Sequence, residues 1–271
     1  MLPSGLQSVQ PPKSPLQAGV YLLGAGPGAL DLITVRGQRL LQQADVILYA
    51  NSLVPSQMLD WTRPDAEKIG TASLTLEVIL PLMIERVRAG KSVVRLHSGD
   101  PSLYSAIHEQ IQALSEAGVP FEVIPGISAF QAAAAKLNAE LTIPELVQSI
   151  ILTRISGRTQ VPEAEELASL AAHKTSLCLY LSARHIEVAQ AQLLQHYSAE
   201  TPVAICYRVG WPDECIHLVR LKDIAAVTQR ENWIRTTLYI VSPALAATAA
   251  RSRLYNPDHT HLFRSRSQKN Q

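Results

Sequence analysis

Three short segments that contain glycine have the residue types most suited to binding a ligand. They are Gly24-Ala25-Gly26-Pro27-Gly28, Ser98-Gly99-Asp100-Pro101 and Pro125-Gly126-Ile127-Ser128. Each follows a short apolar run that predicts a buried strand. Small residues let a ligand approach the backbone closely, and ligands of α/β sheets bind beyond the carboxyl ends of the strands. The three segments therefore predict a ligand site formed largely by main chain.

The first segment also fits a nucleotide-binding pattern. Residues 24–29 satisfy G-x-G-x-x-A after a strand, which is typical of a dinucleotide-binding turn. Pro27 argues against this reading because it removes a backbone N–H where a pyrophosphate needs donors. The strand at 46–49 also ends without an acid that could bind a ribose hydroxyl. A nicotinamide-dependent oxidoreductase and a merely tight turn remain alternatives.

The second segment offers two titratable side chains. Asp100 can cap the helix that follows it, or it can hold a polar or cationic group of a ligand. His97, which precedes the segment, can face a substrate or be a satisfied core histidine. No pair of histidines has metal-ligand spacing, and there is no G-x-S-x-G nucleophile elbow. We therefore expect no catalytic metal and no serine hydrolase.

Several arginines lie near the ends of predicted strands. Each taken alone is a surface residue, but together they could bind a polycarboxylate, because guanidinium binds carboxylate bidentately. The net charge of +1 gives no strong overall field for nucleic acid, so a local patch is expected instead. The arginines are Arg36, Arg39, Arg95, Arg154, Arg158 and Arg208.

Strand and helix patterns alternate along the chain and predict an α/β fold. In the first half, strands are expected at 20–23, 46–49, 92–96 and 121–124, with helices at 32–43, 76–89, 105–117 and 130–137. Such alternation builds a mostly parallel sheet. In the second half, strands are expected at 149–153, 177–181, 203–207 and 237–241, an antiparallel strand at 217–219, and helices at 162–172, 186–197 and 221–229.

These patterns divide the chain into four parts. We expect a flexible leader at 1–18, an N-terminal α/β domain at 19–143, a C-terminal α/β domain at 144–245, and a basic, disordered tail at 246–271. The tail is expected to be disordered because chain ends fray unless they are held.

Composition excludes several classes of protein. Of the 271 residues, 47% are hydrophobic and 17% are charged, which excludes a disordered chain. Three cysteines without CxxC spacing do not form a disulfide framework, and they fit a reducing cytoplasm. No apolar run reaches the ~18 residues that cross a bilayer, and the first residues contain prolines but no apolar h-region, so we expect no signal peptide. A cytoplasmic protein that binds neither membrane nor nucleic acid is expected.

The three segments, in this order and with Thr236-Thr237-Leu238 near the end, resemble the tetrapyrrole (corrin/porphyrin) methyltransferases, which use S-adenosylmethionine. The resemblance covers about residues 18–245. It implies two α/β domains with a ligand cleft between them, usually in a homodimer. It also implies that the cofactor lies folded in that cleft and that the glycine-rich turn binds no phosphate.

Further segments narrow the resemblance to one branch of the family. They are residues 96–104, 140–145, 151–154, 207–208 and 211–214. The branch implied methylates carbon 11 of precorrin-4, or of cobalt-precorrin-4, in cobalamin biosynthesis. A methyltransferase for another precorrin carbon and a non-catalytic tetrapyrrole carrier are the alternatives within this chemistry.

The resemblance also implies site residues. Arg36, Arg95, Arg154 and Arg208 would hold carboxylates of the tetrapyrrole. No general base is carried over, because the place of an acid in uroporphyrinogen-type relatives is Ala50, followed by Asn51, and their lysine has no clear match near Lys68. Ala129 stands where this branch often has a second serine. Cofactor contacts, many through the main chain, would be Pro27, Ser98, Gly99, Asp100, Leu103, Tyr104, Ser128, Ala129, Leu181, Val209, Thr237 and Leu238.

Overall fold

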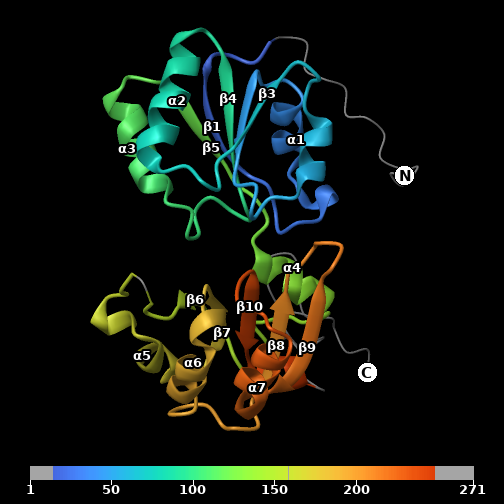
Figure 1. The fold of residues 1–271 in the computed structure, drawn as a ribbon. Coiled ribbons are helices and arrows are strands. Elements are labelled where there is room, and N and C mark those ends of the chain that lie inside the picture. The colour runs from blue at the N-terminus through green and yellow to red at the C-terminus, as the bar shows by residue number, and fades with distance from the viewer. Residues whose placement is uncertain (1–14, 158, 248–271) are drawn as a thin grey trace, which may run out of the picture. The chain divides into compact units, whose positions relative to one another are not determined.

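The computed structural model describes residues 15–157 and 159–247, and these form two compact units. Unit 1 comprises residues 15–132 and 208–214, and unit 2 comprises 133–207 and 215–247. Each unit contains a five-stranded sheet with helices (Figure 1), which confirms the α/β class. The division falls at 132/133 rather than at 143/144, and the loop 208–214 joins unit 1. Arg158, most of the expected leader and nearly all of the expected tail lie outside the described residues.

The sheet of unit 1 is entirely parallel, with strand order β3-β2-β4-β1-β5. The expected strand positions are confirmed, and β3 is an addition. It was missed because its sequence, Glu-Lys-Ile-Gly, has one large apolar residue and the strand lies at the sheet edge. The strands are β1 (Gly19–Gly24), β2 (Val46–Tyr49), β3 (Glu67–Gly70), β4 (Ser92–His97) and β5 (Phe121–Ile124).

Helices α1 (Val35–Leu41), α2 (Leu76–Arg88) and α3 (Ile107–Glu116) cover the two faces of this sheet (Figure 1). On one face, Val94 and Leu96 pack in a cluster with Leu41 of α1. On the other, Val93 packs in a cluster with Met83 of α2 and Leu114 of α3. Alternate residues of a strand point to the same face. Arg95 and His97 therefore share the face of Val93.

Two expected helices in unit 1 begin later than their hydrophobic patterns indicate. Thr34 caps α1 by accepting a hydrogen bond from the Gly37 N–H at 3.1 Å, so the helix expected from residue 32 starts at Val35. The 3₁₀ turn Leu30–Leu32 precedes it. Ala106 has a left-handed backbone (φ 50°), so α3 starts at Ile107 rather than at 105.

The sheet of unit 2 is mixed, with strand order β6-β7-β10-β8-β9. β6 and β7 are parallel, whereas β10 is antiparallel to both β7 and β8. The antiparallel strand expected at 217–219 is confirmed as β9. The strands are β6 (Ile150–Arg154), β7 (Ser176–Tyr180), β8 (Pro202–Tyr207), β9 (Cys215–Arg220) and β10 (Thr237–Val241).

The helices of unit 2 are shorter than expected, and 3₁₀ turns occupy parts of the predicted ranges. α5 (Leu167–Ala171) follows a 3₁₀ turn at Glu163–Glu165, and α7 (Ile224–Arg230) follows one at Leu221–Asp223. α6 spans Ile186–Leu193, and α4 (Ala129–Lys136) spans the boundary between the two units. A buried cluster that includes Leu179, Ile205 and Tyr239 packs the sheet against α5, α6 and α7.

The reversed direction of β10 brings its start next to the ends of other strands. Thr237, its first residue, pairs with Tyr207, the last residue of β8. Arg154 and Tyr180, the last residues of β6 and β7, also pair with each other. One edge of this sheet therefore presents, in sheet order, Arg154, Tyr180, Thr237 and Tyr207. Among the described residues, no helix is both long and apolar enough to cross a membrane.

Candidate functional site

The three glycine-containing segments meet at one edge of the unit 1 sheet. The ends of β1, β4 and β5 are adjacent, because Gly24 pairs with His97 and Leu23 pairs with Ile124. The Gly26 N–H donates to the Gly99 carbonyl at 3.2 Å, and the Gly99 N–H donates back to the Gly26 carbonyl at 2.8 Å. The segments, expected to converge from their positions after strands, thus lie side by side and bond through their main chains.

Close packing at this convergence requires glycine. A Cβ atom on Gly24 would lie 2.6 Å from the Gly99 carbonyl oxygen and 2.7 Å from the Gly126 Cα atom, and neither contact is tolerable. A Cβ atom on Gly126 would strike the same Gly99 oxygen. Gly26 and Gly99 also have positive φ angles of 79° and 66°. The absence of side chains at these glycines therefore allows the three loops to touch through their main chains.

Asp100 fastens two of these loops together. Its Oδ2 atom accepts a hydrogen bond from the Gly126 N–H at 2.8 Å, and its Oδ1 atom accepts one from the Ser102 N–H at 2.9 Å and another from the Ser102 hydroxyl. It does not cap the following helix, because α3 begins only at Ile107. The carboxylate bonds to protein donors, so its direct effect is to shape the loops.

The charge of Asp100 is favoured by these bonds. Burial acts to raise the pKa of the Asp100 carboxyl, but hydrogen bonds from the Ser102 side chain, the Gly126 main chain and the Ser102 main chain outweigh it. The pKa therefore lies below its ordinary value, and the carboxylate is ionised at neutral pH.

The loop 208–214, between β8 and β9, packs on the first glycine segment. A Cβ atom on Gly210 would lie 2.7 Å from the Ala29 nitrogen, and a Cβ atom on Gly28 would clash with the Trp211 ring. The Gly210 N–H donates to Glu214 Oε2 at 2.6 Å, which fixes the turn. Val209, an expected cofactor contact, is buried in this loop. Nothing local in the sequence indicates this contact between segments so distant along the chain.

Residues with left-handed backbone occur at or beside several expected cofactor contacts. Tyr104 and Leu181 have φ of 53° and are 45% and 67% exposed. Arg208 (φ 48°) precedes Val209, and Thr236 (φ 54°) precedes Thr237. This conformation costs about 1–2 kcal/mol per residue for a side chain with a Cβ, and such strain is concentrated at functional sites. An exposed leucine in this conformation, such as Leu181, contributes little to packing.

The remaining expected cofactor positions fall in two groups. In unit 1, Pro27 and Ser128 are buried, Ser98 and Leu103 are half-buried, and Ala129 is the first residue of α4. The Ser128 N–H donates to Gln131 Oε1 at 2.9 Å. In unit 2, Leu181 follows β7, and Thr237 and Leu238 begin β10, the neighbouring strand.

The four arginines expected to bind substrate differ in their partners. Arg36 forms an exposed ion pair with Glu122. The Arg208 guanidinium lies 4.1 Å from the centre of the Trp211 ring, and its Nε atom lies 3.0 Å from Asp213 Oδ1. Arg154 donates two hydrogen bonds of 2.9 Å to the main-chain carbonyls of residues 159 and 160.

Arg95, by contrast, is buried without an anion. It is 8% exposed, and its Nη1 atom donates to Thr71 Oγ1 at 2.8 Å. Within the part of the chain that the structure describes, its Nε atom has no acceptor and no acid pairs with it. Burial lowers the pKa of Arg95 to about 10, which still leaves it charged at neutral pH. A buried charge without a partner is costly, so this site favours an anionic ligand.

His97 shares the strand face of Arg95 and is also incompletely bonded. It is 5% exposed, and its Nε2 atom has no hydrogen-bond partner among the described residues. Burial, and then the nearby Arg95 charge, lower the pKa of His97 to about 3. The imidazole is therefore neutral and is not the satisfied core histidine that one reading of the sequence suggested.

The positions examined for a general base hold structural or exposed residues. Asn51 Oδ1 accepts a hydrogen bond from the Ala72 N–H at 2.9 Å, which ties the ends of β2 and β3 together. Lys68 is exposed on the edge strand β3. Neither arrangement provides a proton acceptor aimed at a ligand.

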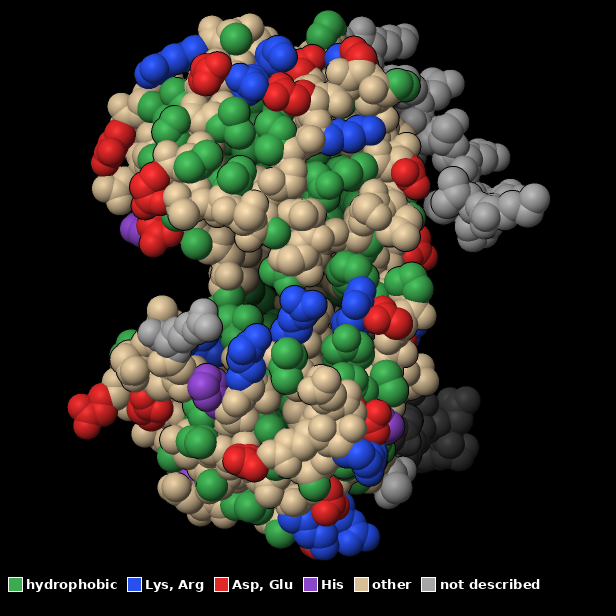
Figure 2. Space-filling model, in the orientation of Figure 1, with side chains coloured by type: hydrophobic (Ala, Val, Ile, Leu, Met, Phe, Trp, Pro, Cys, Tyr) green, Lys and Arg blue, Asp and Glu red, His purple; other side chains and the backbone are tan. Residues whose placement is uncertain are grey.

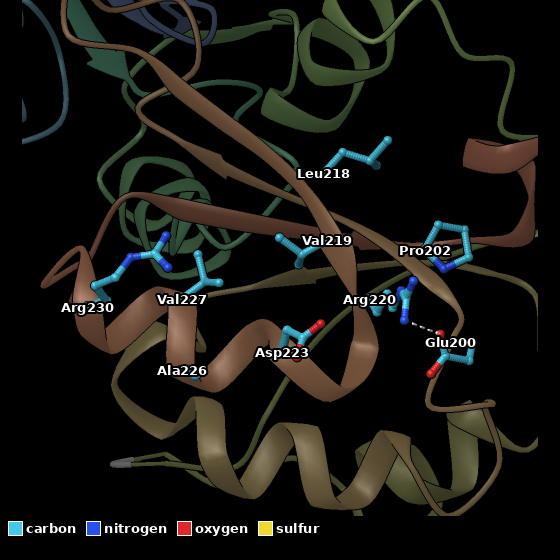
Figure 3. Close-up of a pocket in the computed structure, with 9 residues that line it drawn as sticks. All are labelled: Glu200, Pro202, Leu218, Val219, Arg220, Asp223, Ala226, Val227 and Arg230. Atoms are coloured by element: carbon cyan, nitrogen blue, oxygen red, sulfur yellow. Dashed lines mark ion pairs between the residues drawn. The ribbon is translucent and has the colours of Figure 1, made fainter.

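A pocket of about 630 Å³ lies elsewhere, along β9 and α7 of unit 2 (Figure 3). Its lining mixes apolar residues such as Leu218 and Val219 with the paired charges of Arg220 and Glu200, whose Nη1 and Oε2 atoms are 2.8 Å apart. No residue expected to bind cofactor or substrate lines it. The candidate functional site is therefore assigned to the glycine loops and not to this pocket.

The chain belongs to the Tetrapyrrole (Corrin/Porphyrin) Methylases, whose family pattern matches residues 19–225. A similar curated relative is the precorrin-4 C(11)-methyltransferase of Pseudomonas aeruginosa, which is 47% identical over 246 residues that cover 90% of this chain and 98% of the relative. The resemblance read from the three glycine-containing segments is confirmed.

Solved structures agree with this assignment. An X-ray structure of a cobalt precorrin-4 methyltransferase matches with a TM-score of 0.81 and 44% identity, covering 83% of this chain and 95% of that one. The uroporphyrin-III C-methyltransferase of Thermus thermophilus, solved with S-adenosylhomocysteine, matches with a TM-score of 0.69 and 26% identity, covering 84% of this chain and 93% of that one.

The bonds at Asp100 lead to a stability prediction. In Asp100→Asn, an amide NH₂ replaces one carboxylate oxygen and must face either the Gly126 N–H or the Ser102 N–H, so one hydrogen bond is lost. The free energy of unfolding should fall by about 1–3 kcal/mol, near the lower end because the site is partly exposed. Urea unfolding at neutral pH measures this. Asp65→Asn, which removes an exposed partner of Arg63, is the control and should change little.

The difference in stability between the wild type and Asp100→Asn should depend on pH. The folded-state pKa of Asp100 is depressed, so its contribution is complete above the unfolded pKa of about 3.9 and is lost as the pH falls through the folded value. The gap between wild type and Asp100→Asn should therefore narrow in acid. A constant gap from neutral pH to pH 3 would contradict the assigned bonds.

Proposed function

We propose that the protein is an S-adenosylmethionine-dependent methyltransferase that adds a methyl group to carbon 11 of precorrin-4, or of its cobalt form, in cobalamin biosynthesis. The observation that carries this proposal is the close main-chain convergence of the loops at Gly24, Gly99 and Gly126, in a chain whose similar relatives include named precorrin-4 C(11)-methyltransferases over almost their whole length. High identity to both a precorrin-4 and a cobalt-precorrin-4 enzyme leaves both substrates as candidates.

The residues of unit 1 fit a nucleoside with a sulfonium group. Ser98, Gly99 and Gly126 of the converging loops are half-buried, and Pro27 lacks the N–H that a phosphate would require, which matches a cofactor without phosphate. Tyr104, four residues after Asp100 in the sequence, is exposed and has a strained left-handed backbone, and its aromatic ring could stack on the nucleoside base. When bound, S-adenosylmethionine supplies the methyl group and a sulfide that leaves.

The protein's part in such a displacement is to hold the reactants in line. Fixed geometry can lower a barrier by about 7–11 kcal/mol in favourable cases. The loops are suited to this because hydrogen bonds tie them to one another: Gly26 to Gly99, and Asp100 to Gly126. Neither Asn51 nor Lys68 is proposed as a base; the proton acceptor is either unnecessary or supplied by the substrate itself.

Arg95 is the arginine best suited to hold a substrate carboxylate. Unlike Arg36 and Arg208, it has no acid partner among the described residues. A carboxylate of the tetrapyrrole would complete its hydrogen bonding and compensate its buried charge. The neutral His97 beside it can donate or accept one further hydrogen bond.

The setting of the reaction is also part of the proposal. We place the enzyme in the cytoplasm as a homodimer, the assembly that the family resemblance implies. Three free thiols, two of them buried, support a reducing compartment.

Turnover gives the direct test of the proposed reaction. The purified protein, incubated with precorrin-4 and S-adenosylmethionine, should yield a product heavier by one methyl group, and NMR should place that group on carbon 11. A methyl group on another carbon would move the protein to a different branch. Binding without turnover would indicate a carrier, and cofactor fluorescence on titration with a nicotinamide would revive the oxidoreductase.

The glycine convergence predicts a selective loss of cofactor binding. Gly24→Ala should weaken S-adenosylhomocysteine binding at least tenfold in calorimetry, because its Cβ forces the loops around Gly99 and Gly126 apart. Gly118→Ala is the control: its Cβ meets nothing within 4 Å, and the strain at its φ of 64° lowers stability at a site away from the three loops. Circular dichroism and urea unfolding establish that each variant folds. Asp100→Asn is the milder second variant and should weaken binding less. Equal affinities for all three would remove these loops from the site.

Replacing Arg95 should lower catalytic activity without lowering the stability of the fold. Arg95→Gln should lower kcat/KM for precorrin-4 by about 10–100-fold, the loss of a charged hydrogen bond, while S-adenosylhomocysteine affinity is unchanged. Its unfolding free energy should hold or rise, because an uncompensated buried charge is removed. Arg88→Gln, on the exposed end of α2, is the control. A destabilised Arg95→Gln variant with wild-type turnover would show a purely structural role.

A further inference from the structure

The segments that carry three arginines follow or precede adjacent strands at one end of the unit 2 sheet. Arg154 ends β6, and the adjacent strands β7 and β10 end and begin at Tyr180 and Thr237. Neighbouring strands are about 4.8 Å apart, so these three chain positions lie within about 10 Å along the edge. Arg184 follows β7 in a 3₁₀ turn, and Arg235 precedes β10 by two residues.

Hydrogen bonds hold the segments that carry these arginines. The Ser182 hydroxyl donates to the Tyr180 carbonyl at 2.6 Å and accepts from the Ile155 N–H at 3.2 Å, which fixes the start of the 3₁₀ turn against the end of β6. The Thr237 hydroxyl donates to the Arg235 carbonyl at 3.1 Å. Arg184 and Arg235 themselves are exposed.

The charges at this edge differ from those elsewhere in unit 2. Over residues 133–157, 159–207 and 215–247, the structure gives no ion pair for Arg154, Arg184 or Arg235. In the same stretch, Arg220 pairs with Glu200 and Arg230 pairs with Glu231. Figure 2 shows Lys and Arg side chains gathered along one border of this unit. The uncompensated arginines therefore share one edge of the sheet, and the compensated ones lie along β9 and α7.

The same edge carries strained backbone. Leu181 lies between β7 and Arg184, and Thr236 lies between Arg235 and β10, and both have left-handed φ angles. These segments also contain Leu181 and Thr237, which are proposed cofactor contacts. The arginines without an acid partner therefore lie in the same segments as expected cofactor contacts. Such an arrangement suits an anionic substrate that is held next to the cofactor.

We propose that Arg184 and Arg235, together with Arg154, form a rim that binds the carboxylates of the tetrapyrrole substrate. This inference rests on the proposed function and adds two residues to it. Guanidinium groups bind carboxylates through paired hydrogen bonds, and exposed side chains can reach several acidic groups around a macrocycle. With a net charge of +1, the chain has no general field for polyanions, so a few placed arginines must provide the attraction.

The experiment compares two double variants with equal loss of charge. Arg184→Gln/Arg235→Gln removes rim charges, and Arg220→Gln/Arg230→Gln removes charges around the pocket along β9 (Figure 3). Four quantities are measured: the Kd for uroporphyrin, a stable tetrapyrrole polycarboxylate, by fluorescence; kcat and KM for precorrin-4; and the Kd for S-adenosylhomocysteine by calorimetry.

The rim predicts a loss confined to the substrate. Each single rim variant should raise the uroporphyrin Kd and the KM about three- to tenfold, and the rim double variant more than tenfold, with kcat and the S-adenosylhomocysteine Kd little changed. Salt should weaken uroporphyrin binding to wild type more steeply than to the rim double variant. Arg184→Lys/Arg235→Lys should restore binding partly, since the charge returns without the bidentate geometry.

Two results would overturn the rim. One is a rim double variant that binds uroporphyrin as wild type does, and the other is an equal loss in both double variants. Failure of the proposed function shows differently, as wild-type protein that does not methylate precorrin-4. In that case the uroporphyrin titrations still decide whether these arginines hold a tetrapyrrole.

Discussion

The close contact of three loops at glycine residues is the constraint on which the candidate site depends. Gly24, Gly99 and Gly126 lie so close that a single Cβ atom on Gly24 or Gly126 cannot be accommodated. The parallel sheet explains why they meet: β1, β4 and β5 are neighbours, and parallel strands bring their carboxyl ends to one edge. Asp100 then fastens two of the loops with its carboxylate. The surface thus depends on backbone packing rather than on a set of reactive side chains.

Charge compensation separates structural arginines from candidate ligand-binding ones. Several arginines have an acid within reach, such as Asp213 for Arg208 or Glu200 for Arg220. Arg95 in unit 1 has none among the residues described, and the same holds for the rim in unit 2. A protein that must receive an acidic ligand benefits from such unpaired groups, because an internal acid would compete for the same guanidinium. The cost in stability is greatest at Arg95, which is buried.

Sequence patterns predicted most strands and the family, because buried strands are compact apolar runs and the glycine segments are local signals. They missed β3, whose edge position leaves it one large apolar residue. They placed the starts of α1 and α3 too early, because Thr34 and Ala106 have non-helical backbone and the helices begin only after them. The two sequence readings of Asp100 were a helix cap and a ligand contact. The observed clasp to Gly126 is a long-range bond that no local pattern contains.

Long-range topology also explains why part of the candidate site was not predictable. Arg184 and Arg235 each resemble ordinary surface residues. Only the insertion of β10 between β7 and β8 makes their segments neighbours. Likewise, the contact of Trp211 with Gly28 joins segments far apart in sequence. The sequence indicated which residues are unusual, whereas strand order determined which of them come together.

The loop 208–214 has a consequence for any attempt to divide this protein. By its contacts the loop belongs to unit 1, yet its two ends are the paired residues Tyr207 and Cys215 of a hairpin in unit 2. A fragment cut after residue 132 would lose the wall that Gly210 and Trp211 build against Gly28 and Ala29. The N-terminal and C-terminal halves of the chain therefore cannot be exchanged independently between relatives. A chimaera between relatives would need to take this hairpin tip from the same parent as the first glycine turn.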